Sequence, residues 1–306
     1  KLLYVIIIIM SCEIIFVNLK NHQHYIMDNI KNLLLFNNKN ITVITEKRLF
    51  PEFKDLQDKV KLVDETELDL SYFDNSNKQN DKFRNGFWPL TSRRLFCVYE
   101  YIKKYNIENS FHLENDTMVY TNLSSILDNL NKDKIYLTMD APNRCIAGIM
   151  FIPKFFNMAP LIENYMYNKN DMLNLVNFYI KNQGFCEAFP IMKANQHFKG
   201  TSNELFTKNY EKFQGIFDAA AIGQYLGGVD PRNKRGDSRG FVNETCKVDY
   251  SKYKFIWKRN ENALYVPHIE IDNKFVPVFN LHIHSKRLEN FMADQPKETK
   301  LITQSL

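Results

Sequence analysis

Residues 13–45 predict a strand, a helix and a second strand, and this unit limits the possible folds more than any other feature. Glu13–Asn18 is rich in β-branched residues, and Ile41–Thr45 has a similar composition. Between them, residues 22–36 carry apolar side chains at helical spacing: Tyr25, Ile26, Ile30, Leu33 and Leu34. A β-helix-β unit of about 30 residues implies parallel strands with a right-handed crossover.

Shorter apolar runs continue this alternation along the chain. We expect further strands at residues 59–63, 110–113, 135–138, 146–153 and 275–284. We expect short helices at residues 123–130 and 219–226, a longer helix capped by Thr91 or Ser92, and a mixed, largely helical stretch at residues 155–215. Residues 64–85 are polar and predict a loop. This order of elements indicates an α/β layer fold with an elaborated C-terminal half.

The composition excludes several classes of protein. With 306 residues, of which 44% are hydrophobic, the chain can form one large α/β domain or two smaller ones. Its 40 Lys and Arg against 35 Asp and Glu give a mild charge of +5, and no arginine-rich stripe argues for a nucleic-acid partner. The 5 cysteines include no CxxC pair, which argues against a zinc ribbon or a disulfide scaffold and predicts mostly free thiols.

The N-terminal residues 1–12 allow three interpretations. Lys1 is followed by the apolar run Leu2–Met10, which resembles a signal-peptide core and is shorter than the roughly 20 residues of a membrane-spanning helix. The segment is a signal or signal-anchor leader, an extra buried strand, or the first strand of the domain. We favour the leader, with the first domain strand starting near Glu13. Two locations stay open for the protein: the cytoplasm, or a membrane to which this segment anchors it.

An acidic motif follows the predicted strand at residues 110–113. Glu114-Asn115-Asp116 places two carboxylates around one residue at the carboxyl end of an apolar strand, where ligands bind in open α/β sheets. Residues two apart on an extended segment point the same way, so both carboxylates can address one ion. Because hard divalent cations prefer oxygen ligands, the motif predicts a metal site. The alternative is an ordinary polar turn after a strand.

A second polar motif lies near the C-terminus. Strand alternation places three of its residues on one face: Asn280, His282 and His284. Two imidazoles on one face can ligate a metal or contact a phosphate, and the ammonium of Lys286 can neutralise a leaving diphosphate. The alternative is a half-exposed strand with incidental histidines. The sequence has no HExxH motif and no third clustered histidine, which argues against zinc hydrolysis.

Two further features could belong to the same site. Arg93 and Arg94 follow Phe87-Trp88-Pro89 near a helix start, where a guanidinium could bind phosphate or stack on a base. The alternative is a solvated first turn. Asp218 precedes the small-residue run 219–228, so it either caps that helix or faces an acceptor pocket with Gln224 nearby.

This combination resembles the glycosyltransferases of the GT-A fold. Those enzymes share an early βαβ nucleotide-binding half, an acidic Asp-x-Asp-type loop at a strand end and a late His followed by a Lys. The chain is similar to the uncharacterised glycosyltransferase-like proteins of large DNA viruses and some bacteria. The segments that carry the resemblance are residues 16–18, 25–30, 35–37, 91–95, 112–120, 218–233 and 280–286. Glu114 stands where the family pattern has Asp.

The resemblance implies an α/β fold with a mixed, Rossmann-like sheet flanked by helices. It also implies a division of the chain into a leader or anchor at residues 1–12, a single domain at 13–290 and a polar tail at 291–306. Within the domain, a nucleotide-binding half at about 13–120 would precede an acceptor half at about 121–290.

The resemblance further implies a role for each candidate residue. The ligands of Mn²⁺ or Mg²⁺ would be Asp116, His282, His284 and Glu114. Of the two histidines, we slightly favour His284 as the metal ligand, because it lies nearer the strand end and Lys286. The residues binding the donor nucleotide would be Asn18, Arg94, Glu114, Asn115, Ser285 and Lys286. Asp218 and Gln224 would be catalytic, with Asp218 as an acceptor-binding group or a general base.

Three functions remain open at this point. The leading one is a metal-dependent glycosyltransferase of the hexosyltransferase type, which moves a sugar from a UDP- or GDP-sugar donor to a hydroxyl of a glycan or protein acceptor. The metal would act as a Lewis acid on the leaving diphosphate. The second is a nucleotide- or glycan-binding module that kept the fold and lost turnover. The third is a metal-dependent hydrolase or nucleotidyltransferase.

Overall fold

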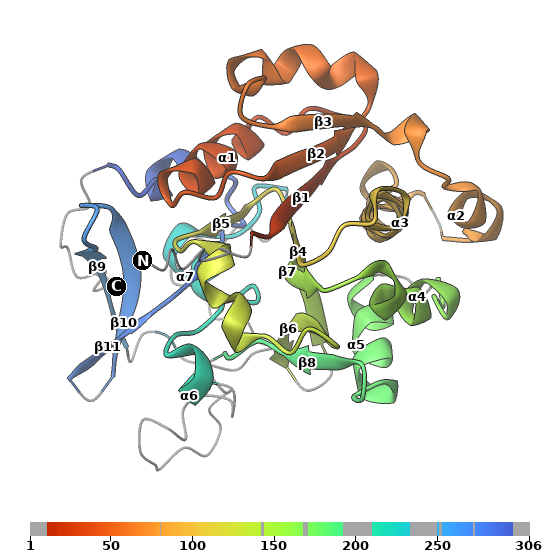
Figure 1. The fold of residues 1–306 in the computed structure, drawn as a ribbon. Coiled ribbons are helices and arrows are strands. Elements are labelled where there is room, and N and C mark those ends of the chain that lie inside the picture. Colours follow the sequence, from red (N-terminus) through yellow and green to blue (C-terminus); the bar gives the residue numbers. More distant parts are fainter. Residues whose placement is uncertain are drawn as a thin grey trace, which may run out of the picture.

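A seven-stranded sheet forms the centre of the protein (Figure 1). The computed structural model describes residues 11–79, 81–141, 144–167, 171–191, 210–232, 250, 253–271 and 273–295. The strand order is β3-β2-β1-β4-β7-β6-β8. In chain order, these strands are β1 (Glu13–Asn18), β2 (Ile41–Thr45), β3 (Lys61–Asp64), β4 (Ser110–Leu113), β6 (Ile135–Ala141), β7 (Arg144–Ile152) and β8 (Cys186–Ala188).

The pairing of these strands makes the sheet mixed. β3, β2, β1 and β4 run parallel to one another, whereas β7 is antiparallel to both β4 and β6, and β8 joins β6 in parallel. The predicted unit at residues 13–45 is confirmed, because the parallel strands β1 and β2 enclose the helix α1 (Tyr25–Leu35). The α/β class and the mixed sheet flanked by helices are likewise confirmed.

Helices cover both faces of the sheet because successive strand residues point to opposite sides. In β1, Ile15 and Val17 belong to one core, and Ile14 and Phe16 belong to another. The first core is shared with α3 (Phe87–Tyr105), α4 (Phe155–Glu163) and α5 (Asp171–Lys181), and the second with α1 (Figure 1). Full burial of one such side chain contributes about 1.5–3 kcal/mol, so these two layers fix the sheet in place.

The C-terminal part adds a third core beside the main sheet. Its elements are β5 (Thr117–Val119), α7 (Ile222–Gly227), β9 (Lys254–Arg259), β10 (Tyr265–Ile271), β11 (Lys274–Pro277) and β12 (Asn280–His282). β9, β10 and β11 form an antiparallel sheet, and β12 pairs with β5, antiparallel. The backbone N–H of Ala293 donates to the side chain of Asn32 on α1 over 2.9 Å, which ties the C-terminal part to the first half. The two predicted halves are therefore in direct contact.

Short helical turns fill the connections. They are η1 (Lys47–Leu56), η2 (Glu65–Glu67), α2 (Ser71–Ser76), η3 (Phe83–Asn85), η4 (Leu123–Asn129), α6 (Tyr210–Phe213) and η7 (Leu288–Phe291). Three of these, η2, α2 and η3, lie within residues 64–85, which the sequence predicted as a loop. Phe73 of α2 is buried against α3, and this tertiary contact stabilises a helix too short to be indicated by periodicity.

Two other predicted boundaries were wrong. α3 begins at Phe87 with Gly86 as its N-cap, and not at Thr91 or Ser92. Pro89 lies in the first turn, where backbone N–H groups have no intrahelical partner, so the helix tolerates it. The single strand predicted at residues 275–284 is two strands, β11 and β12. Val278 is the last residue that hydrogen-bonds to β10. The N–H of the next residue, Phe279, donates instead to the carbonyl of Ile216 over 2.8 Å, so the pairing changes between β11 and β12.

The predicted polar tail starts too early. Phe291, Met292 and Ala293 are buried in the third core, because apolar side chains at these positions pack against α7 and β12. Residues 296–306 lie outside the described residues, as do residues 1–10. The leader or anchor therefore stays a prediction. None of the helices in the described ranges combines the length and the apolar character that a membrane span requires.

The cysteines agree with the expectation of free thiols where they are described. Cys12, Cys97, Cys145 and Cys186 are buried, and none of them forms a disulfide with another described residue. Cys246 lies outside the described residues.

His112 on the central strand β4 predicts how stability depends on pH. Its ring is fully buried, and Nδ1 lies 3.0 Å from the carbonyl oxygen of Ile15. Burial, assisted by the nearby Arg94 charge, lowers the pKa of His112 to about 3. In the unfolded chain a histidine has a pKa of about 6.5. Between these two values the unfolded chain binds the proton and the folded protein does not, so stability falls as the pH falls.

We expect the unfolding free energy to fall by about 2 kcal/mol between pH 7 and pH 5 because of His112. Urea denaturation of the parent and of His112→Asn at both pH values measures it, because carboxylate effects are common to the two proteins. His24→Asn, at an exposed position, controls for the loss of an imidazole. An equal pH dependence in the parent and His112→Asn would show that His112 is not held neutral.

Candidate active site

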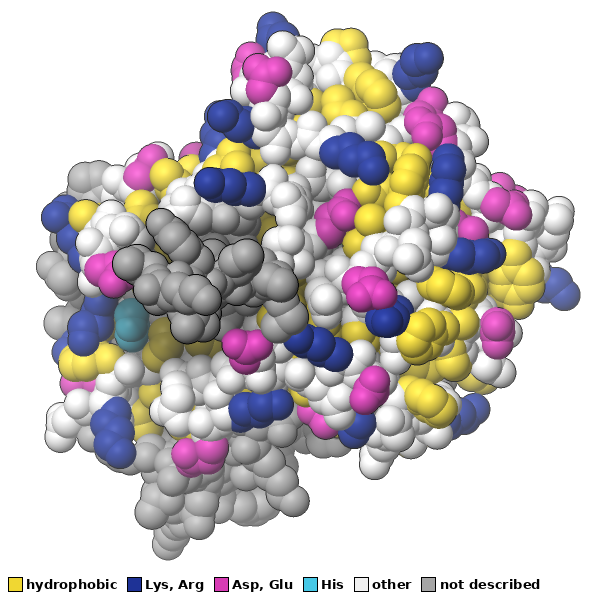
Figure 2. Space-filling model, in the orientation of Figure 1, with side chains coloured by type: hydrophobic (Ala, Val, Ile, Leu, Met, Phe, Trp, Pro, Cys, Tyr) yellow, Lys and Arg dark blue, Asp and Glu magenta, His cyan; other side chains and the backbone are white. Residues whose placement is uncertain are grey.

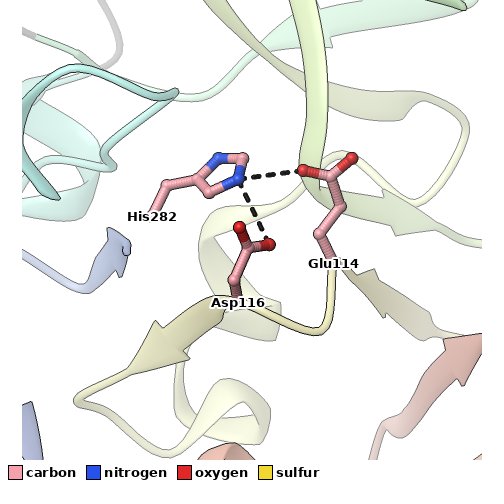
Figure 3. Close-up of side chains that lie close together, drawn as sticks. All are labelled: Glu114, Asp116 and His282. Carbon is pink, nitrogen blue, oxygen red and sulfur yellow. Dashed lines mark ion pairs between the residues drawn. The ribbon is translucent and has the colours of Figure 1, made fainter. Parts of the chain in front are cut away.

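The acidic motif forms a tight turn between β4 and β5. The N–H of Thr117 donates to the carbonyl of Glu114 over 3.0 Å, which closes the turn through Asn115 and Asp116. The sequence predicted an extended segment, so the reason for convergence differs: the turn carries both carboxylates toward one point from its two ends (Figure 3). The side chain of Asn29 on α1 donates to the carbonyl of Asn115 over 3.1 Å and holds the turn against the helix.

His282 meets these carboxylates because β12 pairs with β5. In the antiparallel register His282 lies opposite Thr117, directly after the acidic turn. Its Nε2 is 3.1 Å from Oε2 of Glu114 and 3.3 Å from Oδ1 of Asp116 (Figure 3). The ligand atoms of these three residues all lie within 4.8 Å of one another. The cluster combines two carboxylates and one imidazole, which are all possible ligands of a divalent metal ion.

The other ring nitrogen of His282 fixes the orientation of the imidazole. Nδ1 lies 3.0 Å from the carbonyl oxygen of Ala219, and a carbonyl can only accept a hydrogen bond. Nδ1 therefore carries a proton, and Nε2 faces Glu114 and Asp116; once Nε2 loses its own proton, its lone pair is directed between the two carboxylates. This is the arrangement that a metal-binding histidine requires from its surroundings.

Asp218 holds His282 and α7 in position. Its carboxylate accepts hydrogen bonds from four backbone N–H groups at 2.7–2.9 Å: those of Ala221, Ile222, Gly223 and His282. Because this carboxylate takes the N–H groups of residues 221–223, α7 starts at Ile222 and not at the predicted Ala219. Asp218 is 2% exposed and is not among the residues that line the cavity described below. The geometry gives it a positioning role and does not favour the predicted catalytic one.

Two glycines allow the backbone and ring of His282 to fit. A Cβ atom on Gly223 would lie 2.3 Å from the carbonyl oxygen of His282, and one on Gly148 would lie 3.0 Å from its Nδ1. The first distance is far below van der Waals contact, so α7 can approach β12 this closely only with glycine at position 223. Gly148 on β7 leaves room for the ring itself.

The buried carboxylates, the imidazole of His282 and the ammonium of Lys286 stabilise one another's charges. Burial opposes the charged form of His282, yet the carboxylates of Asp116 and Glu114 raise its pKa well above the usual value. Burial also opposes ionisation of Asp116, but Lys286 and His282 hold the pKa of that carboxyl well below its usual range. The ammonium of Lys286 contacts Oδ2 of Asp116 directly. His284 is affected in the other direction, since burial and the neighbouring His282 lower its pKa well below the usual value.

Arg94 connects the acidic turn to α5. Its guanidinium contacts Oε1 of Glu114 and lies 3.0 Å from Oδ2 of Asp171, the first residue of α5. Burial opposes ionisation of Glu114, but Arg94 lowers the pKa of this carboxyl below its usual value. Arg94 was predicted to contact the donor nucleotide; in this structure, its guanidinium binds two carboxylates.

A cavity of about 730 Å³ lies over this cluster. Its walls come from the segment after β1, the start of α3, the acidic turn, the start of β7, α7 with the segment after it, and β12 with the segment after it. The lining includes Glu114, Asn115, Asp116, His282, His284, Lys286, Arg94, Asp171, Gln224, Tyr25, Arg84, Trp88, Asp230 and Arg232. Among the described residues on the face drawn in Figure 2, acidic and basic side chains are interspersed and form no continuous basic surface of the kind that nucleic acid binds.

The remaining candidates differ in their distance from this cavity. Asn115 and Gln224 line it, whereas Asn18 and Ser285 are buried and do not. The Asn18 side chain accepts a hydrogen bond from the N–H of Gln23 over 3.2 Å. His284 lines the cavity with its ring 4.5 Å from that of His282, but only His282 lies between the carboxylates. The slight sequence preference for His284 is not supported by this arrangement.

Sequence reasoning missed three residues that shape the site. Gly148 interrupts an apolar strand, and an isolated glycine in a strand indicates close approach of another group, so this signal was present. Gly223 lies in the small-residue run 219–228, but the run does not indicate that His282 is the residue it contacts. Asp171 follows the polar run Asn168-Lys169-Asn170. In the sequence it looks like any acidic residue in the first turn of a helix.

Comparison with known proteins gives distant structural likenesses. No family model and no curated protein matches the chain. Mouse xyloside xylosyltransferase 1 is 12% identical with a TM-score of 0.45, over 58% of this chain and 85% of that one. The bifunctional glycosyltransferase WbbM is 16% identical with a TM-score of 0.41, over 66% and 43%. A cytidylyltransferase from Leptospira borgpetersenii is 12% identical with a TM-score of 0.37, over 67% and 84%. These values are too low to indicate a shared activity.

Gly223→Ala should disrupt the cluster through the backbone of His282. The new methyl group would overlap the His282 peptide, so β12 or α7 must move, and we expect a loss of about 1–3 kcal/mol of unfolding free energy. Gly184→Ala is the matched control, because a Cβ there meets no atom within 4 Å. Chemical denaturation measures both. Equal stability of the two variants would contradict the close packing of α7 on β12.

Proposed function

We propose that the protein is a metal-dependent glycosyltransferase that uses a nucleotide-sugar donor. The observation that supports this most is the convergence of Glu114, Asp116 and His282 beside the ammonium of Lys286, within one cavity. Two carboxylates and an imidazole form a cation-binding set, and an adjacent ammonium suits an anion bound to that cation. A nucleoside diphosphate carries such an anion, and its ester to a sugar is the donor in this chemistry.

The residues of the cluster fit a divalent metal by their chemistry. Carboxylate oxygens suit Mg²⁺ and Mn²⁺, and the addition of an imidazole nitrogen favours Mn²⁺. Glu114, Asp116 and His282 would hold the ion, with Ala219 fixing the ring of His282 and Arg94 fixing Glu114. When bound, the ion supplies Lewis-acid charge to the leaving diphosphate. His284, beside His282 and kept neutral by burial, would face the same ligand.

The other residues of the chain would bind and orient the donor. Lys286 contacts Asp116 without a donor, and its ammonium would turn to the diphosphate oxygens when one binds. The Nζ of Lys286 lies 5.7 Å from the centre of the Tyr25 ring, and Tyr25 also lines the cavity. Asn115 would contact the nucleotide from the acidic turn. Asp218 would act through His282, which it positions.

Donor hydrolysis tests the proposal. The protein is incubated with Mn²⁺ and a panel of UDP- and GDP-sugars, and release of nucleoside diphosphate is measured. We expect slow hydrolysis of at least one donor, and loss of this activity by orders of magnitude in Asp116→Asn and in His282→Ala, since each removes a cation ligand. Asp55→Asn, at an exposed position in η1, is the control for loss of a carboxylate.

Three results would contradict the proposal in different ways. Undiminished Mn²⁺-dependent turnover in folded Asp116→Asn would exclude this cluster as the metal site. Binding of nucleoside diphosphate and Mn²⁺ by the parent without turnover of any donor, and without transfer to any acceptor, would favour the binding module. Hydrolysis of nucleotides that carry no sugar would favour the hydrolase or nucleotidyltransferase.

Metal binding should release a proton from His282. The raised pKa of His282 keeps its ring protonated at pH 7, and a cation bound at Nε2 must displace that proton. We therefore expect release of about one proton per Mn²⁺ and an affinity that rises with pH. Calorimetric titration in two buffers of different ionisation enthalpy counts the protons. His284→Gln is the matched control, since the low pKa of His284 leaves no proton to release. Release of no proton would show that Mn²⁺ does not bind at Nε2.

A further inference from the structure

Three aromatic side chains gather where the cavity meets the start of α3. The rings of Phe83 and Trp88 stack with centroids 5.6 Å apart and planes 10° apart, and Phe87 meets Trp88 edge-on at 4.8 Å. Phe87 and Trp88 line the cavity, and Phe83 is 48% exposed. We call these three residues the aromatic rim. The metal and diphosphate roles proposed above do not involve them.

The chain holds this rim in place with an unfavourable backbone. Arg84, Asn85 and Gly86 have consecutive positive φ angles of 46°, 55° and 86°, a region that glycine adopts freely and Asn tolerates, but that is strained for Arg84. The Nζ of Lys20 donates to the carbonyl of Asn85 over 2.6 Å and helps to maintain the segment. Conformations of this kind persist where the surrounding structure fixes them, and here they place aromatic rings at a cavity.

A polar pair accompanies the rings. The guanidinium of Arg84 lies 3.2 Å from Oδ2 of Asp230, which comes from the segment after α7, and both residues line the cavity. The same guanidinium lies 5.5 Å from the centre of the Phe83 ring. Flat apolar surface beside a planar donor and a planar acceptor matches the chemistry of a sugar ring, which has apolar C–H faces and hydroxyls that both donate and accept.

The position of the rim separates it from the metal-binding set. Trp88 and Arg94 are six residues apart on α3, a rise of about 9 Å along the helix, and Arg94 contacts Glu114. The rim therefore lies in the same cavity as the cluster, about two helical turns away from it. A ligand on the rim can approach a donor whose diphosphate is held at Asp116 and Lys286 without occupying that place.

We propose that the aromatic rim binds a sugar ring of the acceptor, so that the acceptor is a glycan. This inference rests on the proposed function. The rings of Trp88 and Phe87 take the apolar face of the sugar, and Arg84 and Asp230 bind its hydroxyls. The rim also makes Trp88 a direct reporter of occupancy, because the chain has only 2 tryptophans and the other, Trp257, belongs to β9 and does not line the cavity.

Fluorescence of Trp88 tests sugar binding without any turnover. In Trp257→Phe, saturated with Mn²⁺ and UDP or GDP, we titrate methyl α- and β-glycosides of glucose, galactose, mannose and N-acetylglucosamine, and their disaccharides. We expect a saturable change in Trp88 emission with at least one glycoside, and its loss in the additional variant Phe83→Ala. No change with any glycoside overturns the inference. An emission change caused entirely by the nucleoside diphosphate also overturns it, because the rim would then bind the base.

Kinetics separate this inference from the proposed function. Trp88→Ala should lower transfer to the identified glycoside at least about 10-fold through KM, while donor hydrolysis without acceptor stays near the parent value. Trp88→Phe should restore most of the transfer. Phe156→Ala, at an aromatic residue 55% exposed on α4, is the matched control. An equal loss of hydrolysis and transfer in folded Trp88→Ala overturns the inference. If the parent itself neither hydrolyses nor transfers, the proposed function fails, and the fluorescence titration still decides whether the rim binds sugar.

Discussion

The antiparallel pairing of β5 with β12 is the interaction on which the site depends. It places His282 opposite Thr117, so that an imidazole from the end of the chain meets the carboxylates of the acidic turn. The same pairing brings Lys286 to Asp116, although these residues are 170 positions apart in the sequence. Without this two-stranded ladder, Glu114 and Asp116 would form an acidic turn with no nitrogen ligand and no ammonium.

The ladder in turn depends on Asp218 and Gly223. The carboxylate of Asp218 joins the N–H groups of α7 and of His282, so helix and strand share one buried acceptor. Gly223 removes the side chain that would separate them. Asp218, which the sequence analysis proposed as catalytic, is thus a buried acceptor that fixes the backbone carrying His282.

Charge balance explains how two carboxylates can be enclosed together. Arg94 compensates Glu114 from one side and Lys286 compensates Asp116 from the other, while His282 lies between them. Buried charges are tolerated when they are paired and hydrogen-bonded, as these are. A cation could take the place of the His282 proton in this balance, and an anion could then draw Lys286 away from Asp116. The aromatic rim extends the same cavity with a surface of different chemistry.

The sequence by itself determined the early parallel strands, the α/β class and the two motifs of the site, because strand and helix periodicities and the ends of strands are local properties. Glu114, Asp116, Lys286 and the pair of His282 and His284 could be chosen from their chemistry and position alone. Only the tertiary structure decided that His282 and not His284 lies between the carboxylates, that Asp218 is a backbone acceptor and that Arg94 joins Asp171. The first two outcomes depend on the register of β12 against β5 and on the approach of α7 through Gly223, and the third depends on the packing of α3 against α5. All three are contacts between distant segments, and no local pattern encodes them.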